Sequence, residues 1–355
     1  MKEDIYRSLC TKNKTLAIMP TFSCTARCRD CGSHRQSRRE NRLSRAQIIE
    51  SISQAGELDF VNIVFTGGEA TLMWENLLKG IRFSSSIGLQ TRLVSNGHWA
   101  CSMDDARNCL EELIKNGLNE INFSTGDEHS RFIPVEFIIN GIMAALEFEM
   151  TAHIMIEYKA IREIKKASIL DNPLLLSLSH EKREKIKITE SPWMPISPTR
   201  TGCYQKNDTI DVDNVALREG CPSVLQSYCI EADGRIAACC GLGISEIPEL
   251  YVGMIRGKNY LKRAIEYAES DFLKIWLRYK GPEKILAWAA EKNSSIKWQG
   301  LYAHNCQTCQ RLYKDADVAE VIRSNYQELI SDVFQSLWFD VYYYPDRLVS
   351  MKNKN

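Results

Sequence analysis

Three cysteines stand close together near the start of the chain, in the stretch CTARCRDC. They are Cys24, Cys28 and Cys31, and His34 follows three residues later. Thiol and imidazole groups at such short spacing are typical of metal ligands, and two kinds of site fit them. With His34 as a fourth ligand, the group could close a tetrahedral structural zinc site. Without it, the three thiolates could hold a [4Fe-4S] cluster and leave one iron open to an outside ligand.

The composition narrows the kind of protein that carries this loop. Lys plus Arg and Asp plus Glu number 45 each among 355 residues, so we expect neither nucleic acid nor a membrane as a partner. The N-terminus lacks the apolar core of a signal peptide, and no apolar run approaches the roughly 20 residues of a membrane helix. We therefore expect a cytoplasmic protein, in which 13 cysteines favour metal ligands or reactive thiols over disulfides. Four isolated cysteines are expected to be ordinary core or surface residues: Cys10, Cys101, Cys109 and Cys203.

The first 190 residues alternate between strand-like runs and amphipathic helical stretches. Ser44 with Gln47 forms a capping box before one helix. Ser102 caps a second helix with Gly117 just past its end, and Pro134 suits the first turn of a third. This alternation implies right-handed crossovers and a parallel sheet. Because six such units are too few to close an eightfold barrel, the predicted fold is α/β, an open, partial (β/α)6 TIM-like barrel. The strands are expected at 15–19, 60–65, 91–94, 120–124, 152–158 and 185–189.

Unusual residues follow most of these strands. The cysteine loop follows the first strand, TGGEA the second, SNGH the third, STGDEH the fourth and ESPWMP the sixth. Core packing does not select glycines, cysteines and charged groups at these places, whereas ligands bind at the carboxyl ends of parallel strands. One rim of the partial barrel is therefore predicted to form a single site.

The stretch CTARCRDC, the stretch FTGGEATL one strand later and the order of the six units together resemble the radical S-adenosylmethionine (SAM) superfamily, over about residues 15 to 200. The resemblance implies that Cys24, Cys28 and Cys31 hold a [4Fe-4S] cluster whose open iron is chelated by the methionine part of SAM. Electron transfer then cleaves SAM to a 5'-deoxyadenosyl radical, which abstracts a hydrogen from the substrate.

Further positions match the SAM-binding parts of that family. Gly67, Gly68 and Glu69 match the stretch that binds the SAM amino group, where glycines allow close backbone approach and a carboxylate favours an ammonium. Ser124 resembles the position that contacts the ribose. Asp30 departs from the pattern, since the family usually has an aromatic residue just before the third cysteine, near the adenine. Two more residues are candidates to reach SAM or the substrate: Asn96 and Arg200.

A second group of cysteines lies in the last third of the chain, after the Pro-rich stretch SPWMPISPTRTG. The stretch SYCIEADGRIAACCG predicts a hairpin around Asp233 and Gly234. This hairpin and a later cysteine pair resemble the twitch form of the SPASM extension, which implies one auxiliary [4Fe-4S] cluster; a four-cysteine zinc site is the alternative. Cys229 and Cys240 are spare, and three roles are open to them: ordinary buried packing, replacement of a neighbouring ligand, or donation of a hydrogen atom to a substrate radical. The implied auxiliary ligands are Cys221, Cys239, Cys306 and Cys309.

The predicted organisation has four parts. An N-terminal extension (1–14) precedes the radical SAM partial barrel (15–200). A small α+β twitch or SPASM-like domain for the auxiliary cluster (201–320) and a C-terminal helical segment (321–355) follow.

Three functions remain open. We favour a radical SAM oxidoreductase or maturase that modifies a ribosomally made peptide through a crosslink, a thioether or epimerisation. A radical SAM dehydrogenase or epimerase of a small carbohydrate or aminoglycoside-type metabolite is the second, and a non-catalytic zinc-binding interaction protein is the third. The arginines around the first cysteine loop form a solvated face, a docking site for an acidic electron donor such as a flavodoxin or ferredoxin, or a surface that steers an acidic substrate.

Overall fold

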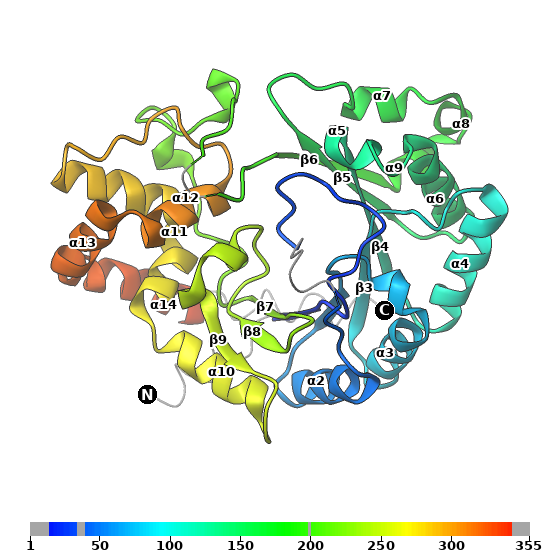
Figure 1. Cartoon of the computed structure of the whole chain (residues 1–355), viewed down its shortest axis with the longest axis horizontal. Helices are drawn as coiled ribbons and strands as arrows, with labels where there is room; N and C mark the ends of the chain where they lie inside the picture. Colours follow the sequence, from blue (N-terminus) through cyan, green and yellow to red (C-terminus); the bar gives the residue numbers. More distant parts are fainter. Residues whose placement is uncertain (1–13, 34–39, 198–199, 343–355) are drawn as a thin grey trace.

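The computed structural model describes residues 14–33, 40–197 and 200–342. Their strands form one nine-stranded sheet in the order β6-β5-β4-β3-β2-β1-β7-β8-β9. Neighbouring strands are parallel from β6 to β7, and the last two pairs are antiparallel. The sheet curves into an open arc with β6 and β9 as its edges (Figure 1). The strands are β1 Thr15–Ile18, β2 Asn62–Phe65, β3 Gln90–Ser95, β4 Glu120–Gly126, β5 Ala152–Tyr158, β6 Ile186–Pro192, β7 Ser227–Ile230, β8 Arg235–Ala237 and β9 Tyr251–Met254.

The six strands predicted for the first part are confirmed as β1 to β6, with ends that differ by a few residues. Between them lie helices that cover the outer face of the arc (Figure 1). The predicted open, partial α/β barrel is therefore confirmed. The helices of this part are α2 Arg45–Glu57, α3 Trp74–Ser86, α4 Met103–Lys115, α5 Asp127–Ser130, α6 Val135–Glu147, α7 Lys166–Leu170, α8 Pro173–Leu176 and α9 His180–Glu184, with the 3-10 helix η2 at Ala70–Met73.

The helix ends follow the predicted capping residues. The hydroxyl of Ser44 accepts from the backbone of Gln47, whose side chain accepts from the backbone of Ser44, and this capping box begins α2. Ser102 begins α4 in the same way, by accepting from the backbone of Asp105 at 3.1 Å. Pro134 stands one residue earlier than predicted, because its extended ψ of 144° makes it the N-cap of α6 instead of a residue of the first turn.

Aromatic rings of the sheet fill the space that helix glycines leave open. A Cβ on Gly80 of α3 would lie 2.7 Å from the ring of Phe65 in β2. A Cβ on Gly141 of α6 would lie 2.5 Å from the ring of Phe123 in β4. Both rings are fully buried, so these two helices pack closely on the sheet because they carry no side chain at the contact.

The second part of the chain extends the same sheet. β7 pairs in parallel with β1, and the backbone of Met19 donates to Ile230 at 2.9 Å. The predicted hairpin is confirmed: β7 and β8 are antiparallel, and Gly234 has a φ of 83° in the turn between them. The division of the chain into separate domains stays a prediction.

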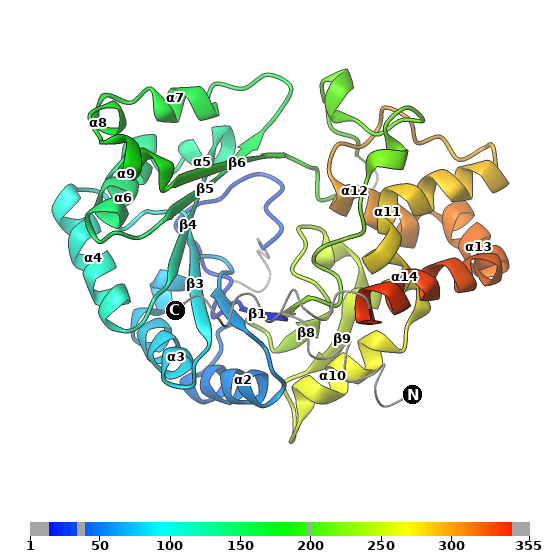
Figure 2. The same cartoon turned by 180° about the vertical axis from the view of Figure 1, so that it is seen from behind.

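Helices complete this second part. In both views α11 to α14 form one group at the end of the molecule away from α4 and α6 (Figures 1 and 2). α11 is kinked at Gly281, whose φ is 81°, directly before Pro282. The helices are α10 Tyr260–Glu269, α11 Phe272–Lys292, α12 Asn305–Lys314, α13 Ala316–Asn325 and α14 Ile330–Tyr342, with 3-10 helices η3 Lys206–Asp208, η4 Val215–Leu217, η5 Ile244–Glu246, η6 Pro248–Leu250 and η7 Tyr326–Leu329.

In the part of the chain that the structure describes, no helix combines the length and the apolar character that crossing a membrane requires. His34 and Cys10 lie outside the described residues.

Candidate active site

The loop that follows β1 lies inside the arc of the sheet (Figure 1). Its three cysteines, Cys24, Cys28 and Cys31, border one cavity of about 350 Å³. The ends of the next three strands border the same cavity, so the predicted single rim is confirmed. Their lining residues include Gly67, Gly68, Glu69, Asn96 and Ser124.

Gly67 and Gly68 let the loop after β2 lie directly against the cysteine loop. Gly67 has a φ of 118°, which residues with a side chain rarely adopt. A Cβ on Gly68 would lie 2.1 Å from the carbonyl oxygen of Ser23. The backbone of Gly68 donates to Thr21 at 3.0 Å, and that of Glu69 donates to Ser23 at 2.8 Å. The glycines thus join two strand-end loops and set the position of the cysteines beside the second one.

The carboxylate of Glu69 is buried and holds three loop residues. Its Oε1 accepts from the backbone and the hydroxyl of Thr71, at 3.3 and 2.7 Å, and from the hydroxyl of Ser95 at 3.0 Å. Its Oε2 accepts from the backbone of Asn96 at 2.9 Å. This side chain therefore fixes the loop after β2 relative to the loop after β3, in addition to bordering the cavity.

Asn96 connects this arrangement to the cysteines. Its side-chain amide donates to the sulfur of Cys24 at 3.4 Å and to the hydroxyl of Thr25 at 3.0 Å. Its Oδ1 accepts from the backbone of His98 at 3.1 Å, which fixes the orientation of the amide. Asn96 thus directs a hydrogen-bond donor at a thiol.

A histidine and a glutamate that sequence reasoning missed border the same cavity. His129 Nδ1 lies 2.9 Å from Glu157 Oε2, and Glu157 also accepts from the backbone of Glu128 at 2.8 Å. Gly126 makes room for this carboxylate, because a Cβ there would lie 1.9 Å from Glu157 Oε2. Gly126 and His129 belong to the stretch STGDEH, which the sequence indicates as a strand end. Their glutamate partner stands on β5, and no local signal pairs the two segments.

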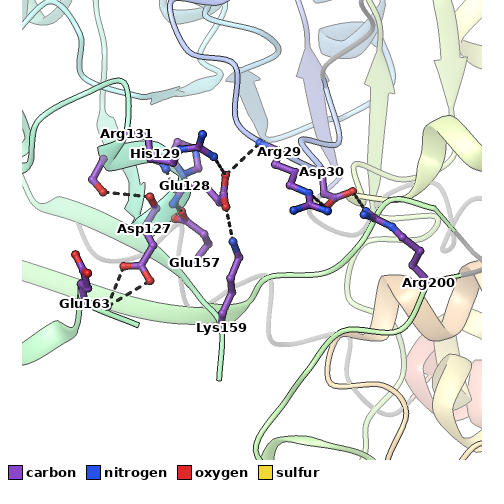
Figure 3. A network of polar contacts seen from close by, with 11 residues as sticks. Arg29, Asp30, Asp127, Glu128, His129, Arg131, Glu157, Lys159, Glu163 and Arg200 are labelled. Atoms are coloured by element: carbon purple, nitrogen blue, oxygen red, sulfur yellow. Dashed lines mark hydrogen bonds and ion pairs between the residues drawn. The ribbon is translucent and has the colours of Figure 1, made fainter. Parts of the chain in front are cut away.

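Asp30 takes part in a network of charged side chains at the edge of the cavity (Figure 3). Its carboxylate accepts from the guanidinium of Arg200 and from the backbone of Ile196, the latter at 3.3 Å. Arg29 Nε lies 3.7 Å from the same carboxylate. Arg200 borders a neighbouring cavity that contains Asp30 as well, so its side chain lies beside the cysteine cavity.

Glu128 is the second carboxylate of this network (Figure 3). It pairs with Lys159 and with Arg131, the latter at 3.0 Å, and it accepts from the backbone of Arg29 at 3.4 Å. Burial opposes its charge, but these partners, Lys159 foremost, hold the pKa of Glu128 below its usual value. The network therefore connects the cysteine loop to the loops after β4 and β5.

Five cysteines of the second part border another cavity, of about 250 Å³. A Cβ on Gly241 would lie 3.1 Å from the sulfur of Cys306 and 3.6 Å from that of Cys239. His304 begins α12 by accepting from the backbone of Cys306 at 3.1 Å. The backbone of Cys221 donates to Leu277 on α11 at 2.9 Å. The four predicted auxiliary ligands are thus brought together: Cys221, Cys239, Cys306 and Cys309.

The two cavities adjoin each other. Leu242 and His304 border both of them. Gly32, next to the last cysteine of the first loop, packs on this boundary, because a Cβ there would lie 2.5 Å from the carbonyl oxygen of Leu242. The two cysteine groups are therefore neighbours in space although they are far apart in the sequence.

The two spare cysteines, Cys229 and Cys240, lie next to the second cavity. Cys240 borders it, and its thiol is hydrogen-bonded to the thiol of Cys229, which is fully buried on β7. This bond raises the pKa of Cys229, together with burial, and lowers that of Cys240.

No known family model matches the sequence, but solved structures share its architecture. Histidine-tagged anSMEcpe with bound AdoMet superposes with a TM-score of 0.54 at 13% identity, over 91% of this chain and 99% of that one. Native anSMEcpe with bound AdoMet and Cp18Cys peptide gives 0.53 at 12% identity, over 91% and 99% of the two chains. Both are radical SAM enzymes.

The chain has the fold of these two structures. Within that fold, the thiols of the first cavity suit an iron-sulfur cluster. Burial raises the pKa of Cys24 to about 11 and that of Cys28 to about 12, so as thiolates these groups need a positive partner, which iron supplies. In residues 14–33, 40–197 and 200–342, no three His, Cys, Asp or Glu side chains are grouped as ligands of a single metal ion. The three thiols border one cavity of about 350 Å³, which has room for a larger group.

The second cavity has a matching donor set. Burial raises the pKa of Cys306 to about 12 and also raises those of Cys239 and Cys309. Burial lowers the pKa of His304 to about 4. Five cysteines border this cavity, and four of their thiols would be enough for a four-iron cluster with no open iron.

Proposed function

We propose that this protein is a radical SAM enzyme that abstracts a hydrogen atom from a ribosomally made peptide. The observation that carries the proposal is the single cavity shared by three cysteines and by the ends of β2, β3 and β4. The fold that it shares with a protein solved with bound AdoMet supports the same conclusion.

In this proposal Cys24, Cys28 and Cys31 hold a [4Fe-4S] cluster at the cavity wall. When bound, this cluster supplies the electron that cleaves SAM to methionine and a 5'-deoxyadenosyl radical. The chain's own residues position the reactants. Asn96 orients Cys24, and the loop that Gly67 and Gly68 hold against the cysteines offers backbone groups to the amino end of SAM.

Ser124 and Glu69 complete the SAM site. Ser124, near the end of β4 and on the wall of the cysteine cavity, is proposed to contact the ribose. Glu69 has a carboxylate for the ammonium of SAM, and its four internal hydrogen bonds hold that carboxylate in one orientation. Because this carboxylate is already held in one orientation, binding a cation costs no further conformational entropy of its side chain.

The second cavity is proposed to hold one auxiliary [4Fe-4S] cluster on Cys221, Cys239, Cys306 and Cys309. Its position next to the first cavity, with Leu242 and His304 between the two, suits electron exchange with the reaction centre. An acidic flavodoxin or ferredoxin is the proposed external electron donor.

A peptide is the proposed substrate class, because the similar structure of anSMEcpe contains a bound peptide and matches this chain over 91% of its length. The crosslinks, thioethers and epimerisations that such chemistry produces all begin with loss of a substrate hydrogen atom. The proposal therefore covers the first chemical step, and the fate of the resulting substrate radical decides the product.

The experiment is reductive cleavage of SAM by anaerobically reconstituted protein, followed by chromatography of 5'-deoxyadenosine. The wild-type protein and the Cys101→Ala control are expected to release it, and Cys28→Ala is expected to release none while keeping about half of the iron. Undiminished release by Cys28→Ala would overturn the assignment of the first cavity. A colourless wild-type protein that contains zinc instead of iron would overturn the proposal as a whole.

A further inference from the structure

A third cavity, of about 450 Å³, opens beside the cysteine cavity. Asp30 and Trp193 border both, so the two hollows adjoin. Two smaller hollows continue from it: Lys159 is shared with one of them, and Ala160 and Ile161 with the other. Together they form a continuous group of hollows beside the cysteine cavity, which we name the entry groove. One of its walls is residues 158–165, and the other includes Trp193 and residues 200–208.

The third cavity has more positive than negative groups on its wall. Arg29, Lys159 and Arg200 border it, with Asp30 as the carboxylate of the lining. Glu128 neutralises Lys159. The carboxylate of Asp30 is shared by the two arginines. One carboxylate between two guanidinium groups leaves one positive charge uncompensated in the third cavity. The two smaller hollows add Arg162 and Lys165 against Glu190 and Asp208, so they leave this balance unchanged.

The two arginines are also accessible to a ligand. The side chain of Arg29 is 69% exposed and that of Arg200 is 42% exposed, whereas that of Asp30 is only 15% exposed. A ligand in the cavity therefore meets guanidinium groups first. Guanidinium groups bind carboxylates through paired hydrogen bonds, and this pairing is favoured where water is partly excluded.

The same walls offer groups that suit a peptide chain. Ile161 borders the third cavity and is 90% exposed, so an apolar side chain is accessible there. Trp193 Nε1 is buried and has no hydrogen-bond partner among the described residues. A buried indole N–H requires an acceptor, and the carbonyl of a bound peptide is of the right kind.

We propose that the entry groove binds an extended, acidic segment of the substrate peptide, with a carboxylate of the peptide seated between Arg29 and Arg200. The bound segment continues past Trp193 towards the cysteine cavity. This inference rests on the proposed function only in taking a peptide as the substrate. The zero net charge of the whole chain provides no general attraction for acidic molecules, so the preference is local to the groove.

The test is selection of binders from a random peptide library displayed on phage, against the purified full chain. The wild-type protein is expected to enrich peptides with Asp and Glu over peptides with Lys and Arg. Arg200→Glu is expected to reverse that preference, and Arg200→Lys to retain it. Arg107→Glu makes the same charge change on the outer surface, where Arg107 pairs with Glu147, and is expected to behave as the wild type.

Binding constants of the enriched peptides, measured by fluorescence polarisation, are expected to weaken at least tenfold in Arg200→Gln. Trp193→Phe removes only the indole N–H and is expected to weaken binding several-fold. Melting curves show whether each variant is folded; if Arg200→Glu fails to fold, Arg200→Gln carries the test.

The inference is wrong if the wild type selects no peptides, if it selects peptides without an acidic excess, or if Arg200→Gln binds them as the wild type does. Iron content and SAM cleavage of the wild type, measured on the same preparation, test the proposed function separately. A protein without iron that still selects acidic peptides would retain the groove and lose the radical chemistry.

Discussion

The side-chain amide of Asn96 points at the sulfur of Cys24, 3.4 Å away. The two residues come from the ends of β3 and β1, which are separated in the sheet by β2. Hydrogen bonds to a thiolate stabilise its charge, and in an iron-sulfur site they affect both the retention and the potential of the cluster. This contact makes Asn96 a positioning residue for the first cavity.

Asn96→Ala is expected to lower the rate of SAM cleavage by about tenfold or more. Loss of a hydrogen bond to a charged group costs about 1.5 kcal/mol or more, and about 1.4 kcal/mol corresponds to a factor of ten. The reduction potential of the first cluster should shift as well, which a purely structural role would not cause. The matched control is Asn140→Ala, which removes an amide that donates to the backbone of Ala100 instead of to a cysteine. Equal rates and potentials in the two variants would refute the role of Asn96.

Glu69→Gln is expected to destabilise even the iron-free protein, by about 3 kcal/mol. The carboxylate oxygens of Glu69 accept from four donors. In the glutamine variant the amide NH₂, itself a donor, would point at one or more of these donors, and those hydrogen bonds would be lost. Chemical denaturation monitored by circular dichroism measures the effect. Glu147→Gln on the surface is the control and should change stability little. If Glu69→Gln unfolds like the wild type, the carboxylate does not fix the loops as described.

Gly141→Ala is expected to lower the free energy of unfolding by about 1 to 3 kcal/mol. In a helix the same change usually stabilises by about 1 kcal/mol. At Gly141, however, the new methyl would lie 2.5 Å from the buried ring of Phe123. Gly56→Ala in α2 is the control, since its methyl would meet only the tip of the exposed Ile87 side chain at 3.0 Å. A stabilising effect at Gly141 would contradict the close helix packing.

Cys240→Ala and Cys229→Ala are each expected to keep the full iron content. The thiol of Cys240 is hydrogen-bonded to the thiol of Cys229, and four other cysteines border the second cavity. Iron and sulfide assays on reconstituted protein measure this, with Cys309→Ala as the variant that loses the second cluster. Loss of about half the iron from Cys240→Ala would make Cys240 a ligand in place of Cys239. The hydrogen-donor hypothesis predicts in addition that the two variants lose incorporation of solvent deuterium into product.

The local parts of the fold were predictable from the sequence. Ser44 and Ser102 indicate the starts of α2 and α4, because a helix cap is a hydrogen bond between residues that are close together in the sequence. The glycines, cysteines and charged residues at strand ends indicated a shared rim, since parallel strands place their carboxyl ends on one side. Asp233 and Gly234 likewise specified the turn between β7 and β8.

The contacts between distant segments were not predictable. The pairing of β7 with β1 joins residues that are far apart in the sequence, and neither strand has a sequence pattern that identifies its partner. Glu69 was expected to serve SAM alone, and its bonds to the neighbouring strand-end loops depend on how β2 and β3 are placed. The same is true of Glu157, which the fold brings to His129, and of Asp30, which the fold brings to Arg200.

The central claim is that three cysteines of the first cavity hold a cluster with an iron open to SAM. The most direct measurement is the electron paramagnetic resonance spectrum of the reduced Cys309→Ala protein, in which the second cluster is removed, before and after addition of SAM. The account predicts the signal of a reduced [4Fe-4S] cluster that changes on addition of SAM, because SAM becomes a ligand of the open iron. An iron-sulfur signal that SAM leaves unchanged, or a first cavity that retains no iron, would contradict it.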